Sequence, residues 1–219
     1  MPIKAVIFDM DGVLIDSTKF CSISHDRLFK EYNIIISGKE HKKYIGMSLR
    51  DKLNEIGGKY NIKFNLEKIT KKLVKHQLEL MKGELKPNKK NLELIKELKN
   101  DSIKIAVATS SSYYRAKKYL KMIKIFPKLD VFITKDDVKR HKPFPDLFLK
   151  AVKELKLKPS ECIVIEDAIN GVIAAKKAGC KCIAVETSFS KKELKKAGAD
   201  LIIKDISKLN KKIIEGFNW

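Results

Sequence analysis

A mostly apolar run near the start of the chain is followed at once by two carboxylates. Asp9 and Asp11 stand two positions apart after the segment Ile3 to Phe8, and Gly12 comes next. The run predicts a buried strand, and in open parallel sheets ligands gather outside the carboxyl ends of the strands. Because glycine lets the backbone turn sharply, we expect both carboxylates to face one crevice at the edge of a sheet. A solvated loop after a strand is the alternative for such a pair taken alone.

A second apolar run ends in hydroxyl side chains. Residues 103–109 run Ile-Lys-Ile-Ala-Val-Ala-Thr, and three serines and a helical pattern over residues 113–122 follow. A threonine hydroxyl and the backbone N–H groups at a helix start favour an anion, because those donors lack partners within the helix. Thr109 and Ser110 are therefore candidate anion-binding residues, with a plain helix cap as the alternative.

One lysine stands out among many because of the chain around it. Two prolines stiffen the segment Lys142-Pro143-Phe144-Pro145-Asp146, and Asp146 is placed to cap a helix over residues 147–155. Most lysines of a protein are solvated surface charges. A rigid loop instead holds its lysine in one place, so Lys142 is a candidate for a fixed positive charge.

A third apolar run, residues 162–166, ends in two adjacent acids. Glu166 and Asp167 precede a helical pattern over residues 169–178, which Gly179 is placed to end. A carboxylate pair at a strand end would complete a site for Mg²⁺, which prefers hard oxygen ligands and keeps several waters. The alternative is that both acids only cap the helix.

Strand and helix patterns alternate after residue 84, which is typical of an α/β fold with a doubly wound parallel sheet. The expected strands are residues 3–8, 103–109, 130–134, 162–166 and 181–185, and helical patterns cover residues 92–98, 116–123, 147–155 and 169–178. Residues 17–83 instead show lysine-rich amphipathic stretches such as 66–81, with little strand character outside residues 34–36. We therefore expect a core domain of residues 1–16 and 84–219 and a small inserted helical domain of residues 17–83.

The formal net charge of +20 would suit a protein that binds nucleic acid, but its distribution argues against one. Residues 17–83 carry 15 Lys plus Arg against 7 Asp plus Glu, which leaves +12 for the other 152 residues. The excess is thus spread over the chain and forms no basic tail. The chain has four arginines, the side chain that base readout favours, so nucleic acid is not the expected partner.

The remaining features of the sequence bear on where in the cell the protein works. No segment reaches the roughly 18 consecutive apolar residues of a membrane span, and the chain start lacks a signal-peptide pattern. The four cysteines follow neither a disulfide-framework pattern nor a zinc-site pattern. We expect a cytoplasmic protein with reduced thiols and no membrane partner.

Taken together, the polar groups at these strand ends follow the order Asp-x-Asp, Thr, Lys, Glu-Asp. This order and spacing resemble the four motifs of the haloacid dehalogenase superfamily of phosphatases and phosphotransferases. The long insertion after the first motif resembles the helical cap of its beta-phosphoglucomutase-like and phosphoglycolate phosphatase-like branch. The resemblance implies that family's α/β core with an inserted cap.

The resemblance also implies roles for the motif residues. Asp9 would be the nucleophile that forms an aspartyl-phosphate, and Asp11 the general acid and then the base for water. Thr109 and the Ser110 backbone N–H would hold the phosphoryl oxygens, and Lys142 would neutralise their charge. Mg²⁺ would be held by Asp9, the Asp11 backbone carbonyl and Asp167, with Glu166 beside them positioning Lys142 or a metal-bound water.

Substrate choice would lie in the inserted domain. Residues 45–51, Ile-Gly-Met-Ser-Leu-Arg-Asp, resemble a cap loop that closes over the substrate in sugar-phosphate members. Gly46, Ser48 and Arg50 are therefore candidates for contacting the nonreacting end, with an ordinary surface loop as the alternative. Two departures weigh against a mutase, because Cys21 and Leu49 stand where the beta-phosphoglucomutases carry a histidine and an arginine. His25 and Arg50 lie close by in the sequence and offer partial compensation.

These observations favour a Mg²⁺-dependent phosphatase that hydrolyses a small phosphorylated metabolite, such as a sugar phosphate or a phosphoglycolate-like acid, and that acts as a monomer. A beta-phosphoglucomutase-type phosphomutase is the alternative enzyme. A non-catalytic protein that binds nucleic acid through its basic surface is the alternative of another class.

Overall fold

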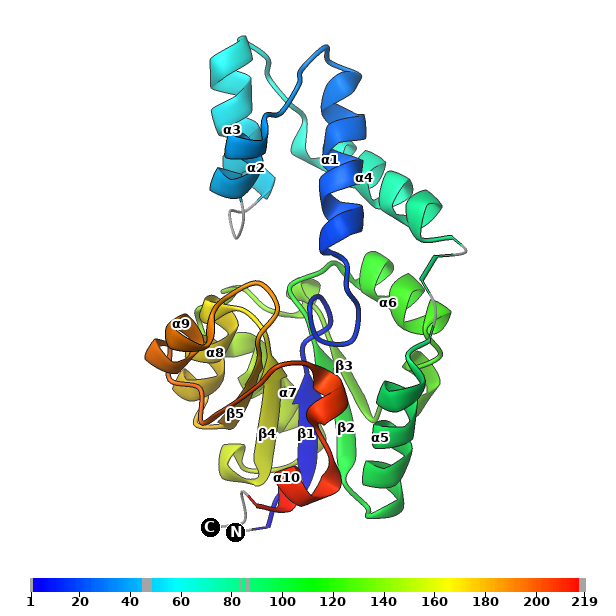
Figure 1. Ribbon diagram of the computed structural model, residues 1–219, viewed down its shortest axis with the longest axis vertical. Helices are drawn as coiled ribbons and strands as arrows, with labels where there is room; N and C mark the ends of the chain where they lie inside the picture. The colour runs from blue at the N-terminus through cyan, green and yellow to red at the C-terminus, as the bar shows by residue number, and fades with distance from the viewer. Residues whose placement is uncertain (1, 45–48, 83, 86, 217–219) are drawn as a thin grey trace. The chain divides into compact units, whose positions relative to one another are not determined.

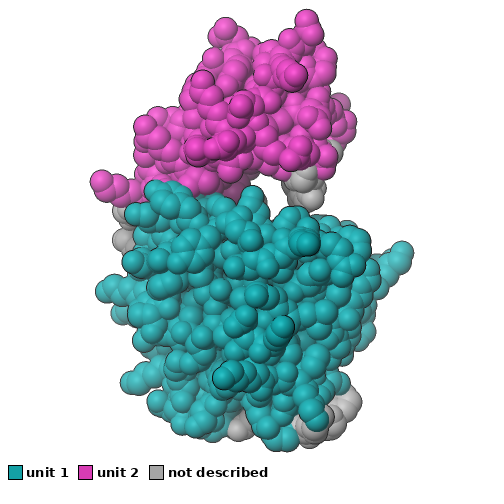
Figure 2. Space-filling view, turned by 180° about the vertical axis from the view of Figure 1, so that it is seen from behind, with its two compact units in different colours: residues 1–16, 85–219 teal, residues 17–84 magenta. Residues whose placement is uncertain are grey.

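The computed structural model describes residues 2–44, 49–82, 84–85 and 87–216. The chain forms two compact units, one of residues Met1–Asp16 and Leu85–Trp219 and the other of residues Ser17–Glu84, coloured separately in Figure 2. The second unit thus ends one residue beyond the boundary expected after residue 83. Among the described residues, no helix combines the length and the apolar character that crossing a membrane requires.

The first unit is built on one parallel sheet of six strands, shown in Figure 1 with helices on both sides. The strand order is β3-β2-β1-β4-β5-β6, and every paired neighbour is parallel. The predicted α/β fold with a doubly wound parallel sheet is confirmed. The strands are β1 (Ala5–Phe8), β2 (Lys104–Ala108), β3 (Val131–Ile133), β4 (Cys162–Glu166), β5 (Lys181–Val185) and β6 (Leu201–Ile203).

Helices cover both faces because the central strands are apolar on both. Ala5 and Ile7 of β1 join one buried cluster with side chains of α7 and α8, while Val6 and Phe8 are fully buried outside that cluster. Helix α5 packs on β2, and α10 packs on α5. The helices of this unit are α5 (Lys89–Asn100), α6 (Tyr113–Met122), α7 (Asp146–Leu155), α8 (Ile169–Lys177), α9 (Lys191–Lys196) and α10 (Lys211–Glu215), with 3₁₀ turns η1 (Phe126–Lys128), η2 (Lys135–Asp137), η3 (Pro159–Glu161) and η4 (Ile206–Lys208).

The second unit is helical in its described part. It contains α1 (Thr18–Lys30), α2 (Gly38–Tyr44), α3 (Leu49–Tyr60) and α4 (Leu66–Met81), and α1 packs along α4. Its own apolar cluster includes Leu28, Phe29 and Leu73. The segment around Ile34–Ile36 forms no strand; Ile34 is buried in that cluster, whereas Ile35 is 79% exposed.

Candidate active site

Carboxylates from two neighbouring strands meet at the carboxyl edge of the sheet. Asp9 follows β1 directly, and the register that pairs Phe8 with Ile165 brings it beside the end of β4. The Asp9 backbone N–H donates to the Ile165 carbonyl at 2.9 Å. One carboxylate oxygen each of Asp9, Glu166 and Asp167 lies within 4.8 Å of the others, and all three residues are buried.

Lys142 lies between two of these carboxylates. Its Nζ is 2.6 Å from Asp9 Oδ1 and 2.5 Å from Glu166 Oε1. Burial alone disfavours the charged ammonium, but the two carboxylates outweigh it and raise the pKa of Lys142. Burial raises the pKa of Asp9 well above its ordinary value, against the opposing charge of Lys142. The structure thus brings together the predicted lysine and the predicted nucleophile, 133 positions apart in the chain.

Glu166 is engaged through both carboxylate oxygens. Oε1 accepts from Lys142, and Oε2 accepts from the backbone N–H groups of Asp167 and Ala168 at 2.7 and 2.8 Å. Gly171 of α8 lies against the same carboxylate. Of the two roles expected for Glu166, these contacts favour the positioning of Lys142. The positioning of a metal-bound water stays a prediction, as does metal ligation by the Glu166–Asp167 pair.

Asp167 is the third carboxylate of the cluster, and it lies beside the turn that follows β1. Its Oδ2 accepts a hydrogen bond from Thr187 Oγ1 at 2.7 Å. Gly12, with φ +82°, leaves room for this carboxylate, because a side chain at position 12 would overlap it. Burial, together with the neighbouring charge of Glu166, raises the pKa of Asp167 to about 6. Three buried carboxylates against one ammonium form an oxygen-rich site with excess negative charge, which fits a hard divalent cation such as Mg²⁺.

The loop after β2 carries the predicted hydroxyl residues. Thr109 is buried, and its Oγ1 accepts from the Ser111 backbone N–H at 3.1 Å. Ser110 is exposed in the loop that leads to α6, three residues before Tyr113. Because β1 and β2 are paired neighbours, this loop leaves the sheet beside Asp9, as the strand-end prediction requires.

Asp11 has two partners that the sequence analysis did not identify. Arg115 of α6 donates from Nη2 to Asp11 Oδ1 at 2.8 Å and from Nη1 to Oδ2 at 2.9 Å. The Ser111 hydroxyl donates to Oδ2 at 2.8 Å. Ser111 and Arg115 stand one helical turn apart, a spacing that places two side chains on one face, and they also contact each other.

Three candidate residues belong to the second unit. Gly46 and Ser48 lie outside the described residues. Arg50 lies in the first turn of α3 with an exposed side chain. Contact of these residues with a substrate therefore stays a prediction.

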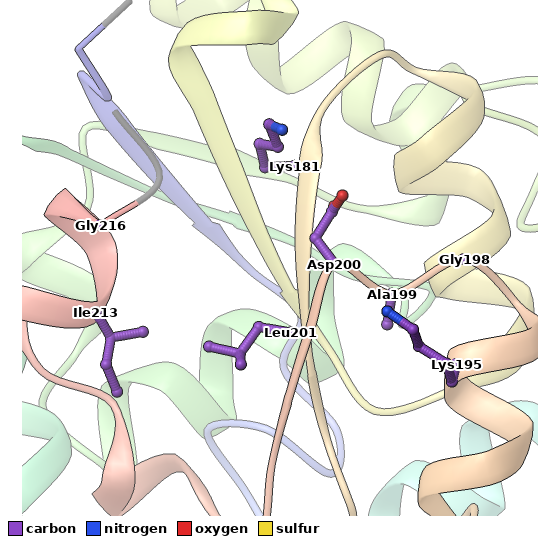
Figure 3. Close-up of a pocket in the computed structure, with 8 residues that line it drawn as sticks. All are labelled: Lys181, Lys195, Gly198, Ala199, Asp200, Leu201, Ile213 and Gly216. Carbon is purple, nitrogen blue, oxygen red and sulfur yellow. The ribbon is translucent and has the colours of Figure 1, made fainter. Parts of the chain in front are cut away.

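A separate surface hollow has a volume of about 630 Å³ and includes none of the three carboxylates in its lining. Figure 3 shows the residues that line it. Lys181 stands at the amino end of β5, so this hollow opens at the sheet edge opposite to the strand exits. Leu201 and Ile213 supply apolar side chains and Lys195 a charged one. It contains none of the predicted site residues and is not the candidate active site.

The fold and site define a doubly wound α/β protein with a lysine-bridged carboxylate cluster at the carboxyl edge of its sheet. The family model of the haloacid dehalogenase-like hydrolases matches residues 6–185, and the chain belongs to this family. The resemblance inferred from the motifs is confirmed.

Individual relatives agree with the assignment over nearly the whole chain. A phosphorylated carbohydrates phosphatase of Thermotoga maritima is 32% identical over 209 residues, which cover 94% of this chain and 97% of the relative. A beta-phosphoglucomutase of Bacillus subtilis is 30% identical over 96% of this chain and 93% of its own. The crystal structure of beta-phosphoglucomutase from Clostridium difficile matches with a TM-score of 0.82 and 27% identity, covering 99% of this chain and 97% of that one.

Proposed function

We propose that the protein is a Mg²⁺-dependent phosphatase that hydrolyses a small phosphorylated metabolite, a sugar phosphate or a phosphoglycolate-like acid. The observation that carries the proposal is the contact of Lys142 with Asp9 beside Asp167 and Glu166. A dianionic phosphate monoester repels a carboxylate nucleophile, so its charge must be neutralised before Asp9 can approach phosphorus. Lys142 supplies one fixed positive charge at that place.

The proposed reaction has two steps. An Asp9 oxygen forms a bond to phosphorus as the ester P–O bond breaks, and Asp11 gives a proton to the departing oxygen. Asp11 then takes a proton from a water, which attacks phosphorus, releases inorganic phosphate and restores Asp9. The hydroxyl of Thr109 and the backbone N–H of Ser110 bind the phosphoryl oxygens during both steps.

Asp9, the Asp11 backbone carbonyl and Asp167 would hold the Mg²⁺. The excess of buried carboxylates at this place supports that assignment. The bound cation would supply further neutralisation of the phosphoryl charge. Gly46, Ser48 and Arg50 would contact the nonreacting end of the substrate.

A phosphomutase of the beta-phosphoglucomutase type is the second candidate. The 30% identity to the Bacillus subtilis beta-phosphoglucomutase favours it. Cys21 and Leu49 weigh against it, because a histidine and an arginine would be expected at these two positions in a mutase. Isomerisation of a sugar phosphate without net phosphate release would identify the mutase.

Phosphate release from a panel of sugar phosphates, phosphoglycolate and nucleotides tests the proposal. We expect Mg²⁺-dependent release by the unmodified protein and none by Asp9→Asn. Asp205→Asn is the matched control, because Asp205 is an exposed cap of η4. Release that persists in Asp9→Asn would overturn the role of Asp9, and salt-sensitive binding of polynucleotides without any phosphate release would favour the nucleic-acid alternative.

A further inference from the structure

The Asp11 carboxylate is held by Arg115 of α6 and by Ser111, which precedes that helix. Arg115 meets both carboxylate oxygens in a two-pronged contact, and Ser111 adds a third hydrogen bond. We infer that Arg115, together with Ser111, is a positioning residue that fixes Asp11 for the acid–base steps. This inference rests on the proposed function, in which Asp11 gives its proton to the departing oxygen and regains one from water. The two-pronged arginine contact fits the carboxylate form of Asp11, which exists between these two proton transfers.

Burial and a neighbouring aromatic ring also fix the Arg115 guanidinium, independently of Asp11. Only 13% of the Arg115 side chain is exposed, and its guanidinium carbon lies 4.8 Å from the ring centre of Tyr119. Tyr119 is fully buried on the same helix. An arginine held by packing and stacking presents a planar fork that matches a carboxylate, which a flexible lysine ammonium does not.

Asp11 needs such a partner because its surroundings constrain it less than those of Asp9. Its side chain is 31% exposed, against 9% for Asp9, and it precedes the turn at Gly12. A misplacement of about 1 Å can cost about 10²-fold in rate. Helix α6 starts just after Thr109 and Ser110, so the segment proposed to bind the phosphoryl group also leads to the residue that holds Asp11.

The competing explanation is that Arg115 only ties the loop after β1 to α6. The two explanations differ in their dependence on the leaving group. An alkyl phosphate needs a proton on its departing oxygen, whereas a p-nitrophenyl ester departs without one. A residue that acts through Asp11 therefore affects the first step with alkyl esters more than with aryl esters, while a purely structural tie affects both alike.

The test is single-turnover phosphorylation of Asp9, measured with glycerol phosphate and with p-nitrophenyl phosphate at saturating Mg²⁺. For Arg115→Met we expect a loss of roughly 10–10²-fold with the alkyl ester, a part of the about 10²–10⁴-fold that general acid–base catalysis contributes, and under about 3-fold with the aryl ester. KM should change little, Arg115→Lys should recover part of the rate, and added guanidinium ion should recover part of it in Arg115→Met. Ser111→Ala should show a weaker form of the same pattern.

Arg27→Met is the control, since Arg27 pairs with Glu79 on the exposed surface of the second unit. It should leave both rates unchanged, and thermal unfolding should show that all variants are folded. Equal losses with the two esters, or no loss, would overturn the role of Arg115 and leave the proposed function standing. Failure of the unmodified protein to transfer phosphate from either ester would overturn the proposed function, and this inference with it.

Discussion

The α carbon of Gly171 lies so close to the Glu166 carboxylate that a methyl group built on it would stand 1.8 Å from Oε1. Helix α8 can pack there only because the residue has no side chain. In Gly171→Ala the carboxylate must leave its place beside Lys142. We expect a loss of about 1–3 kcal/mol in the free energy of unfolding, the usual cost of overpacking, measured by urea denaturation, and a lower rate of phosphate release.

Gly58→Ala is the matched control for that substitution. Gly58 lies inside α3, and nothing stands within 4 Å of a methyl group added there. Because glycine inside a helix costs about 0.5–1 kcal/mol relative to alanine, this variant should gain stability. A change of the same sign in both variants would contradict the packing argument.

Lys142→Met should destabilise the protein strongly in the absence of divalent metal. The substitution leaves Asp9 and Glu166 buried with no cation between them, and breaking such a pair costs about 3–5 kcal/mol. Urea denaturation in EDTA measures the loss. Lys150→Met removes an exposed pair with Glu154 and should change stability by less than about 1 kcal/mol; similar losses in both variants would show that burial of the ion pair is unimportant.

Magnesium should raise the unfolding temperature of the unmodified protein. A ligand at about 100 times its dissociation constant stabilises the state that binds it by about 2.7 kcal/mol. Asp167→Asn removes one carboxylate of the cluster and should abolish most of the shift, whereas Asp205→Asn should keep it. A full shift in Asp167→Asn would place the cation elsewhere.

Three cysteines should resist thiol reagents in the native protein. Burial raises the pKa of Cys162 and of Cys180 to about 12, and it raises the pKa of Cys182 as well. Only the thiolate reacts, so at pH 8, about four units below such a pKa, the reactive fraction is about 10⁻⁴. Mass spectrometry after labelling should find these three cysteines unmodified at pH 8 and all four cysteines modified in urea. Fast labelling of Cys180 in the native state would contradict its burial.

The central strands could be predicted from the sequence, and the motif residues stand at their carboxyl ends. The roles of those residues stay predictions. Strands β1, β2, β4 and β5 are short apolar runs followed by polar residues, the pattern of strands buried on both faces. Strand β6 was not predicted, whereas β3, which is equally short and stands at the other edge of the sheet, lies within the expected residues 130–134. Three residues are too few for periodicity to separate a strand from a loop, so an edge strand of this length can be predicted or missed.

The contact between Arg115 and Asp11 could not be predicted from the sequence around either residue. The two residues are 104 positions apart, and they meet because β1 pairs with β2 in one particular register. Ser111 was seen only as one of three serines before a helix. The one available signal was the spacing of Ser111 and Arg115, a single helical turn apart behind a strand end.

The order of strands has a consequence for protein synthesis. Ala5 of β1 pairs with Lys104 on one side and with Cys162 on the other. A ribosome therefore makes the strand that leads to Asp9 among the first residues, but must deliver more than 150 further residues before both neighbours of that strand exist. Asp9 is translated early, and its surroundings are completed late. Nascent chains arrested before β4 should accordingly lack the three-carboxylate cluster, however well their earlier helices have formed.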